Sequence, residues 1–333
     1  MRKLILIFLF VNFNTVAFNQ VIKGTILDRK TDSTICSASI YINGTFVGTL
    51  SDLNGNFELD ISKNGSRPIT ISSIGYNSVT LTDFSTDKPL LVYMTPKVYE
   101  VKEVVISSKS LVKRRKANLN LFKNVFLGTT SNARSCEIIN ENDITFNYDS
   151  DHDTLKVFSS KPILINNRSL GYKITYYLDR FEYYKRARDI FFSGSLIFNE
   201  DLAIEEAHKE VYERRRKIAY LGSRMHFFRA LWADDFISEG FSVKNSANKY
   251  LNYKDIVEDS RRDSLKNLTK FLKYNGTLRV IYNTRLSNII FLKEKVYFDK
   301  DGYFDQTGRS ISWEGDMMDQ RIGDLLPYTY KIE

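Results

Sequence analysis

The sequence is poor in the residues that most often reveal a function. Its 333 residues include two cysteines, three histidines, two tryptophans and five prolines. Two cysteines cannot build a disulfide framework or a four-cysteine zinc site, and the histidines lack the His-Glu-x-x-His spacing of a zinc peptidase. After residue 20 no apolar run approaches the roughly 18 residues that a membrane-spanning helix needs. We therefore expect no metal and no other cofactor.

Apolar and aromatic residues are abundant by contrast. Hydrophobic residues make up 43% and aromatic residues 14% of the chain, which is enough for a globular protein of about two domains. The net charge of +8 comes mainly from two basic runs, 113–116 and 214–217. Such runs can bind phosphates, but we interpret both as solvated segments. We expect no nucleic-acid partner, and peripheral attachment to a membrane is compatible with this charge.

The first 19 residues have the order of a secretory signal peptide. Arg2 and Lys3 precede the apolar run 4–10 and a shorter, more polar stretch, 12–17, as basic, apolar and cleavage regions do. The apolar run is short for a membrane anchor, and no cysteine lies near residue 20 to carry a lipid. We expect 1–19 to be a signal peptide and the protein to be exported.

Residues 20–107 have the pattern of short strands separated by turns. Three dipeptides, Asn43-Gly44, Asn54-Gly55 and Asn64-Gly65, accept the positive φ of tight hairpins. Alternating or apolar segments accompany them, at 21–27, 39–42, 55–60, 69–73, 90–94 and 101–106. This spacing predicts an all-β sandwich.

The same stretch resembles the carboxypeptidase regulatory-like domain. Its motif pieces occur in the family's order, at 23–28 (KGTILD), 38–42 (ASIYI), 44–45 (GT), 48–49 (GT), 51–57 (SDLNGNF) and 71–76 (ISSIGY). One departure is 34–38, which keeps only the alanine of the family's Pro-Leu-x-Gly-Ala segment. The resemblance implies a transthyretin-like β-sandwich, found beside metallocarboxypeptidases and at the front of TonB-dependent receptors. It implies a non-catalytic module and brings no catalytic residue.

A basic stretch without periodicity, 108–118, is predicted to be a linker. After it, 119–333 is predicted to be a β-rich α+β domain, with strands at 144–148, 154–160, 163–165, 171–181, 190–198, 278–282, 289–293, 295–299 and 310–313. Between them, 200–237 has apolar residues at helical spacing. We expect two helices there, broken at Gly222-Ser223, with Ser223 as an N-cap.

This second region also resembles a known domain, the one that follows the regulatory-like module in many exported or envelope proteins of Gram-negative bacteria. The pieces that carry the resemblance are 126–133 (FLGTTSNA), 170–172 (LGY), 220–227 (YLGSRMHF) and 324–327 (DLLP). The resemblance implies a location in the periplasm or at the outer membrane. It implies no activity.

Few residues are candidates for chemistry. His226 lies in sequence near Asp234 and Asp235, and a carboxylate-oriented base could be built from them, but a histidine that anchors the second helix inside an aromatic core explains the pattern better. We therefore predict no catalytic residue and keep these three as an alternative. Among the aromatic residues, Trp313 and Tyr76 are the candidate binding residues, as platforms for a ligand or glycan.

Together these observations predict a non-catalytic, exported envelope protein that binds a protein or glycan partner through its β-domains. Two alternatives remain open. One is a hydrolase with its site near His226, and the other is a small outer-membrane β-barrel formed by 119–333, against which the helical stretch and the charged strands argue. A disulfide between Cys36 and Cys136 also stays open, because the sequence does not give their separation.

Overall fold

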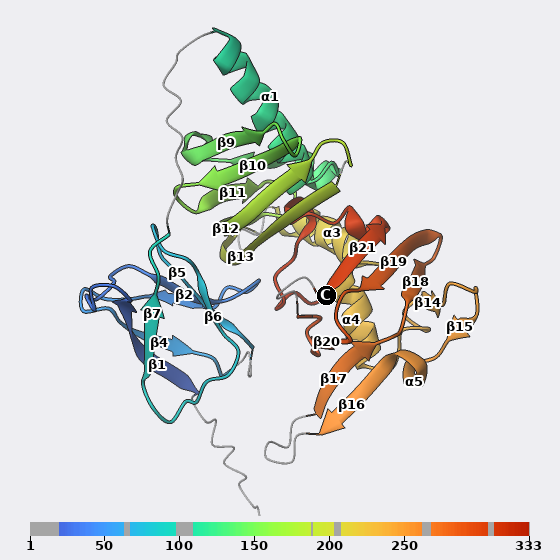
Figure 1. Cartoon of the computed structure of the whole chain (residues 1–333). Helices are drawn as coiled ribbons and strands as arrows, with labels where there is room; N and C mark the ends of the chain where they lie inside the picture. Colours follow the sequence, from blue (N-terminus) through green and yellow to red (C-terminus); the bar gives the residue numbers. More distant parts are fainter. Residues whose placement is uncertain are drawn as a thin grey trace, which may run out of the picture.

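The computed structural model describes residues 20–62, 67–97, 109–187, 189–202, 208–261, 268–305 and 310–332. It shows a mainly β protein, with an N-terminal β-sandwich followed by an α+β region (Figure 1). The sandwich has one hydrophobic core and the α+β region has two. The predicted fold class is therefore confirmed. Within the described ranges, no helix is long and apolar enough to cross a membrane.

The N-terminal domain is a sandwich of a three-stranded and a four-stranded sheet. In the first, β1 (Val21–Asp28) lies between antiparallel β4 (Asn56–Asp60) and parallel β7 (Leu90–Met94). The second has the order β3-β2-β5-β6, formed by β2 (Ser39–Ile42), β3 (Gly48–Leu50), β5 (Ile69–Ser72) and β6 (Val79–Leu81). Alternate residues of the strands fill the core: in β4, Phe57 and Leu59 are buried while their neighbours are exposed.

The turn chemistry of the sandwich follows the sequence prediction at two positions. Gly44 and Gly55 have φ values of 72° and 73°, which glycine adopts without strain. A Cβ at Gly55 would also lie 2.7 Å from the carbonyl oxygen of Ile26. The third predicted turn, Asn64-Gly65, lies outside the described residues.

The first part of the α+β region is a six-stranded antiparallel sheet of order β8-β11-β12-β10-β9, with β13 paired to β12. Buried aromatic rings of α1 and β12 fill its core, with Phe122 stacked on Phe126 and edge-on to Phe181. The elements are α1 (Lys109–Phe126), α2 (Ser131–Arg134), β8 (Cys136–Ile138), η1 (Glu141–Asp143), β9 (Ile144–Asp149), β10 (Thr154–Ser159), β11 (Ile163–Asn167), β12 (Tyr172–Tyr184) and β13 (Asp189–Asp201).

The second part surrounds helix α4 with two smaller sheets. Their orders are β15-β14-β18-β19-β21 and β16-β17-β20, and Phe227, Phe228 and Leu231 of α4 are fully buried among them. The remaining elements are α3 (Lys209–Tyr220) and η5 (Ile322–Asp324), whose Tyr220 and Ile322 belong to the core of the first part. Those of the second part are α4 (Arg224–Trp232), β14 (Phe241–Lys244), β15 (Tyr250–Leu251), α5 (Tyr253–Ile256), β16 (Val257–Arg261), β17 (Leu268–Lys273), β18 (Thr277–Tyr282), β19 (Arg285–Phe291), β20 (Lys295–Phe298), β21 (Ile311–Gly315) and η4 (Asp316–Met318).

Two expectations about this region need correction. The stretch 108–118 is helical from Lys109 onward and belongs to α1; its lysines, arginines and leucine are good helix formers, and Phe122 and Phe126 anchor the same helix to the sheet. The two expected helices exist, and Ser223 caps α4 by accepting a hydrogen bond from the backbone N–H of His226. However, β13 extends to Asp201, so the first of them begins at Lys209.

The sandwich is docked on the α+β region through its β2–β3 turn. The backbone of Gly44 donates to Leu196 O over 2.9 Å, and Phe198 N donates to Thr45 O over the same distance, so the turn satisfies polar groups on the outer edge of β13. Tyr41, fully buried, stacks on Tyr177 with ring centroids 5.1 Å apart. The two domains therefore share a packed, hydrogen-bonded interface.

Candidate functional site

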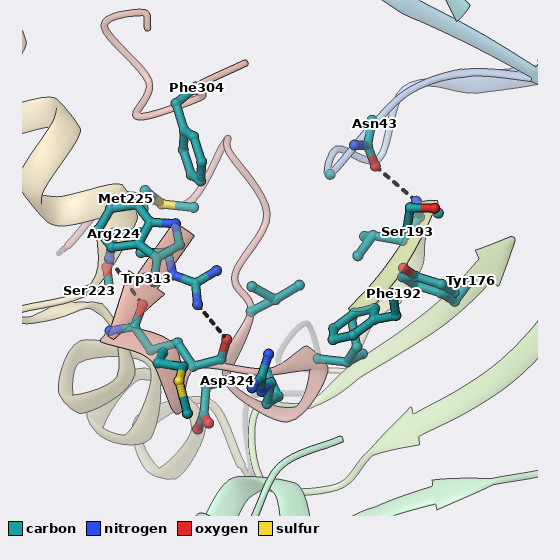
Figure 2. A pocket seen from close by; sticks show the side chains of 18 of the residues that line it. Asn43, Tyr176, Phe192, Ser193, Ser223, Arg224, Met225, Phe304, Trp313 and Asp324 are labelled. Atoms are coloured by element: carbon teal, nitrogen blue, oxygen red, sulfur yellow. Dashed lines mark hydrogen bonds between the residues drawn. The ribbon is translucent and has the colours of Figure 1, made fainter. Parts of the chain in front are cut away.

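A cleft of about 780 Å³ opens where the sandwich meets both parts of the α+β region. Five segments of the chain supply most of the lining of this central cleft: the β2–β3 turn, the β12–β13 hairpin, the start of α4, and the stretches 302–304 and 310–328. Figure 2 shows Phe192 and Ser193 on one side, with Arg224, Phe304 and Trp313 on the other. Its volume lies within the roughly 300–1,000 Å³ of sites for small ligands.

The β12–β13 hairpin forms an aromatic wall of the central cleft. Tyr176 in β12 packs edge-on against Phe126 of α1, with centroids 4.9 Å apart, and Phe126 also contacts Phe192 of β13. Gly194 makes this packing possible, because a Cβ there would lie 2.6 Å from the ring of Tyr176. A glycine in β13 thus lets the ring lie against the strand at the cleft.

The opposite wall is positioned by the start of α4. Gly222 has a φ of 77°, and a Cβ there would collide with the ring of Tyr282, 2.5 Å away. The turn places Ser223 as the N-cap and the Arg224 backbone N–H 3.0 Å from Gln320 Oε1. The side chain of Arg224 is thereby fixed beside the cleft.

Arg224 has no carboxylate partner among the described residues. Its guanidinium donates to the carbonyl oxygens of Met317 and Gln320 and lies over the ring of Trp313, 5.1 Å from the centroid. Burial, together with the positive charge of Arg321, lowers the pKa of Arg224 to about 9. At neutral pH the side chain therefore remains charged, in a place where its charge is poorly solvated.

Arg321 is a second cation in the central cleft. Its guanidinium lies 5.7 Å from the ring centroid of Phe192, and within the described part of the chain it makes no hydrogen bond or ion pair. Burial lowers the pKa of Arg321, with only the exposed Asp319 acting in the opposite direction. Two guanidinium groups that repel each other therefore face one cleft.

The nearby carboxylate of Asp324 is turned toward other groups. Its oxygens accept hydrogen bonds from Thr130 Oγ1, at 2.9 and 3.0 Å, and from Asn132 Nδ2 at 3.0 Å. Burial raises the pKa of Asp324, although these two donors partly offset the effect. Asp324 thus ties the C-terminal stretch to α2.

A buried ion-pair cluster fastens the sandwich beside the central cleft. Arg67 is 3% exposed and donates to Asp299 Oδ2 and Asp301 Oδ2, each over 2.7 Å. The guanidinium also lies 5.2 Å from the ring centroid of Tyr328, which lines the cleft. This cluster joins the N-terminal domain to the β20–β21 region.

The structure places His226 in a core and not in the cleft. The ring is 2% exposed; Nδ1 accepts from Gly222 N at 3.0 Å, and Nε2 lies 2.9 Å from Glu239 Oε2. Because Nδ1 accepts, Nε2 carries the proton and donates to Glu239. Asp234 and Asp235, the carboxylates that we considered as partners, are exposed. The three residues of the alternative catalytic site are therefore not assembled around the histidine.

His226 makes the stability of the protein depend on pH. Burial lowers its pKa below 6.5, more than the hydrogen bond to Glu239 raises it, so the unfolded chain takes up a proton first as the pH falls. We expect the free energy of unfolding to decrease from pH 6.5 down to the folded-state pKa, by at most about 1.4 kcal/mol per pH unit. Urea denaturation between pH 5 and pH 8 measures this slope.

The matched variants for this measurement are His226→Gln and His152→Gln. The first removes the buried titrating ring and should flatten the slope, whereas the second changes a histidine that is 76% exposed and should leave it as in the unmodified protein. Equal slopes in all three proteins would contradict a neutral, buried His226.

The other predicted residues lie in different places. Trp313 of β21 lines the central cleft, whereas Tyr76 lies in the sandwich and donates to Asp28 Oδ2 over 2.8 Å. Cys36 is exposed and Cys136 half-buried, both as free thiols, and burial raises the pKa of Cys136 to about 12. Within the described ranges, no group of three or more potential ligands could hold a metal ion.

Sequence reasoning missed most of the cleft. Arg321, Phe192 and Ser193 carry no recognisable motif, and only the fold brings them together. One signal was present: the segments 220–227 and 324–327, which carried the second resemblance, both contribute residues to the lining. Segments that lie far apart in the sequence can contribute to one site because the fold brings them together.

Comparison with known proteins supports the N-terminal assignment. A family model of the CarboxypepD_reg-like domain matches residues 22–106, in agreement with the sandwich of β1 to β7. No curated protein matches the chain. The family match covers the sandwich and not the α+β region, which supplies most of the central cleft.

Proposed function

We propose that the chain is a non-catalytic, exported protein of the cell envelope that binds a short glycan in the central cleft. Export is proposed from the order of residues 1–19, and a non-catalytic role for the sandwich from its family match. The observation that carries the proposal is a cleft of about 780 Å³ at the junction of the domains, the place where ligand sites are common.

The size and lining of the central cleft favour a glycan over a protein partner. A concave site of this volume takes a few rings, whereas a protein interface needs about 800 Å² of surface on each side. Phe192 and Trp313 offer apolar surface, and Ser193, Ser312 and Gln320 offer hydroxyl and amide groups. Sugar rings have an apolar face and a rim of hydroxyls, so both kinds of lining have a counterpart.

No observation favours the alternative hydrolase. A catalytic base needs to reach its substrate, but His226 is buried in a core with both ring nitrogens engaged. The central cleft contains Asp324, whose carboxylate is held by Thr130 and Asn132.

Binding to a glycan panel tests the proposal. The purified protein is applied to matched neutral and acidic oligosaccharides, together with Ser193→Trp, which puts an indole into the central cleft. We expect the variant to lose at least tenfold in affinity because the indole occupies the ligand's space. The control is Ser85→Trp, at an exposed position of the sandwich, which should bind as the unmodified protein does.

Two results would count against the proposal. Binding that Ser193→Trp leaves intact would place the site elsewhere, and absence of binding to any member of the panel would exclude a glycan ligand. The same samples are assayed for shortened glycans, and cleavage by the purified protein would contradict a non-catalytic role.

A further inference from the structure

The charge inside the central cleft is unbalanced. Three arginines line it, and among the described residues only Arg180 has a carboxylate partner, through Nη2 to Glu182 Oε2 at 2.8 Å. The guanidinium of Arg224 donates only to backbone carbonyl oxygens, and that of Arg321 has no hydrogen-bond or ion-pair partner in the described part of the chain. Both residues are half-buried, and charges withdrawn from water are normally paired, so this arrangement lacks an anion.

The carboxylates nearby do not supply that anion. Asp324 is engaged by Thr130 and Asn132. Asp189 lies at the exposed start of β13 and accepts a hydrogen bond from Ile190 N at 2.8 Å. Asp319 is exposed and only acts on Arg321 through its field. Within the described residues, the guanidinium groups of Arg224 and Arg321 therefore have no carboxylate partner, and they remain the dominant charges at the cleft.

We infer that the central cleft binds a sugar bearing an oxyanion, either a carboxylate or a phosphate, and that Arg321 and Arg224 hold the charged group. This inference rests on the proposed function. A planar guanidinium matches both oxyanions by paired N–H···O bonds. The rings of Phe192 and Trp313 lie under the two guanidinium groups and orient them, while the hydroxyl groups of Ser193 and Ser312 line the same cleft and can bind the sugar hydroxyls.

The two arginines have different roles. Arg224 also stabilises the turn at η4 by donating to Met317 O over 2.9 Å, so its replacement would disturb the fold. Arg321 makes no such bond, and its substitution should change affinity without changing stability. Arg321 is therefore the residue to test.

The experiment titrates glucose, glucuronate and glucose 6-phosphate into the unmodified protein, Arg321→Gln and Arg214→Gln. Trp313 lines the central cleft, so its fluorescence reports binding. We expect at least one anionic probe to bind about tenfold to a hundredfold more tightly than glucose, as a hydrogen bond to a charged group implies. Arg321→Gln should remove the difference, and Arg214→Gln, at an exposed arginine of α3, should preserve it.

Comparison of the three probes across the protein variants distinguishes the possible outcomes. The anion that binds more tightly identifies the oxyanion as a carboxylate or a phosphate, and Arg321→Lys should retain part of the preference because it keeps the charge. Equal affinity for neutral and anionic probes, or a preference that survives Arg321→Gln, would overturn the inference. If the anionic preference is absent but neutral glycans of the panel bind and Ser193→Trp blocks them, the proposed glycan binding stands and the oxyanion inference fails. If no glycan binds, both the proposed function and the oxyanion inference fail.

Discussion

Arg67→Ala should lower the free energy of unfolding by about 3–5 kcal/mol, because it leaves two carboxylates in a half-buried site without their cation. Arg67 is 3% exposed, and Asp299 and Asp301 each lie 2.7 Å from one of its nitrogens. Desolvation alone would lower the pKa of Arg67, but the two carboxylates outweigh it and the pKa is raised. The charged form is thus the one that the fold stabilises. Urea denaturation measures the loss.

An exposed ion pair in the same domain provides the control. Lys23 and Glu58 contact each other on β1 and β4 with both side chains more than half exposed, so Lys23→Ala should cost less than about 1 kcal/mol. Hydrogen exchange adds a local readout: in Arg67→Ala, the amides of Gly44, Leu196 and Phe198, which join the domains, should exchange faster. A loss for Arg67→Ala no larger than for Lys23→Ala would show that the cluster does not fasten the sandwich.

Arg216→Ala should have a comparably large effect, again about 3–5 kcal/mol. Arg216 is 2% exposed, donates to Leu170 O over 2.8 Å and pairs with Asp201 Oδ1 at 2.6 Å and Glu213 Oε1 at 2.8 Å. Its guanidinium lies 4.1 Å from the ring centroid of Tyr172. The substitution removes all these interactions and leaves the acids and a carbonyl without their donor.

The neighbouring arginine offers a close control for this measurement. Arg214 lies in the same basic run and the same helix but is exposed, so Arg214→Ala should change stability by less than about 0.5 kcal/mol. Thermal or urea denaturation of the two variants compares the positions directly. Equal effects would mean that burial and pairing do not distinguish them.

This basic run also shows where sequence reasoning reaches its limit. We interpreted 214–217 as a solvated helix face, which holds for Arg214, Arg215 and Lys217. Arg216 is buried because the helix turns it toward the 167–172 loop and Asp201, residues that the sequence does not place nearby. A run of basic residues shows where charge is concentrated in the sequence, but tertiary contacts determine which of its side chains is buried.

Local signals predicted the elements that depend on local chemistry. Asn-Gly turns and alternation marked the sandwich, and the Gly222-Ser223 break marked the start of α4, because turn and cap preferences act over a few residues. Four strands between residues 241 and 273 were missed. One of them, β15, has only two residues, and β16 (VEDSR) has little apolar alternation; pairing with neighbouring strands, and not intrinsic preference, makes such segments extended.

The candidate site was the least predictable feature. The sequence drew attention to His226, which is buried, and to Trp313, which does line the central cleft. Arg321 and Ser193 are separated by more than a hundred residues and meet only through the packing of the β12–β13 hairpin against the C-terminal stretch. The significance of Arg321 comes from its missing counter-charge, and a missing partner cannot be recognised before the neighbours are known.

If the cleft at the domain junction is the binding site, a bound glycan should protect the walls of the cleft from hydrogen exchange. Hydrogen exchange of the purified protein, with and without the glycan that binds most tightly in the panel, tests it most directly. We expect slower exchange in β13, at the start of α4 and in 318–328, with the glycan unchanged at the end of the experiment. Protection confined to the outer strands of the sandwich would place the binding site elsewhere, and cleavage of the glycan would show that the protein is an enzyme.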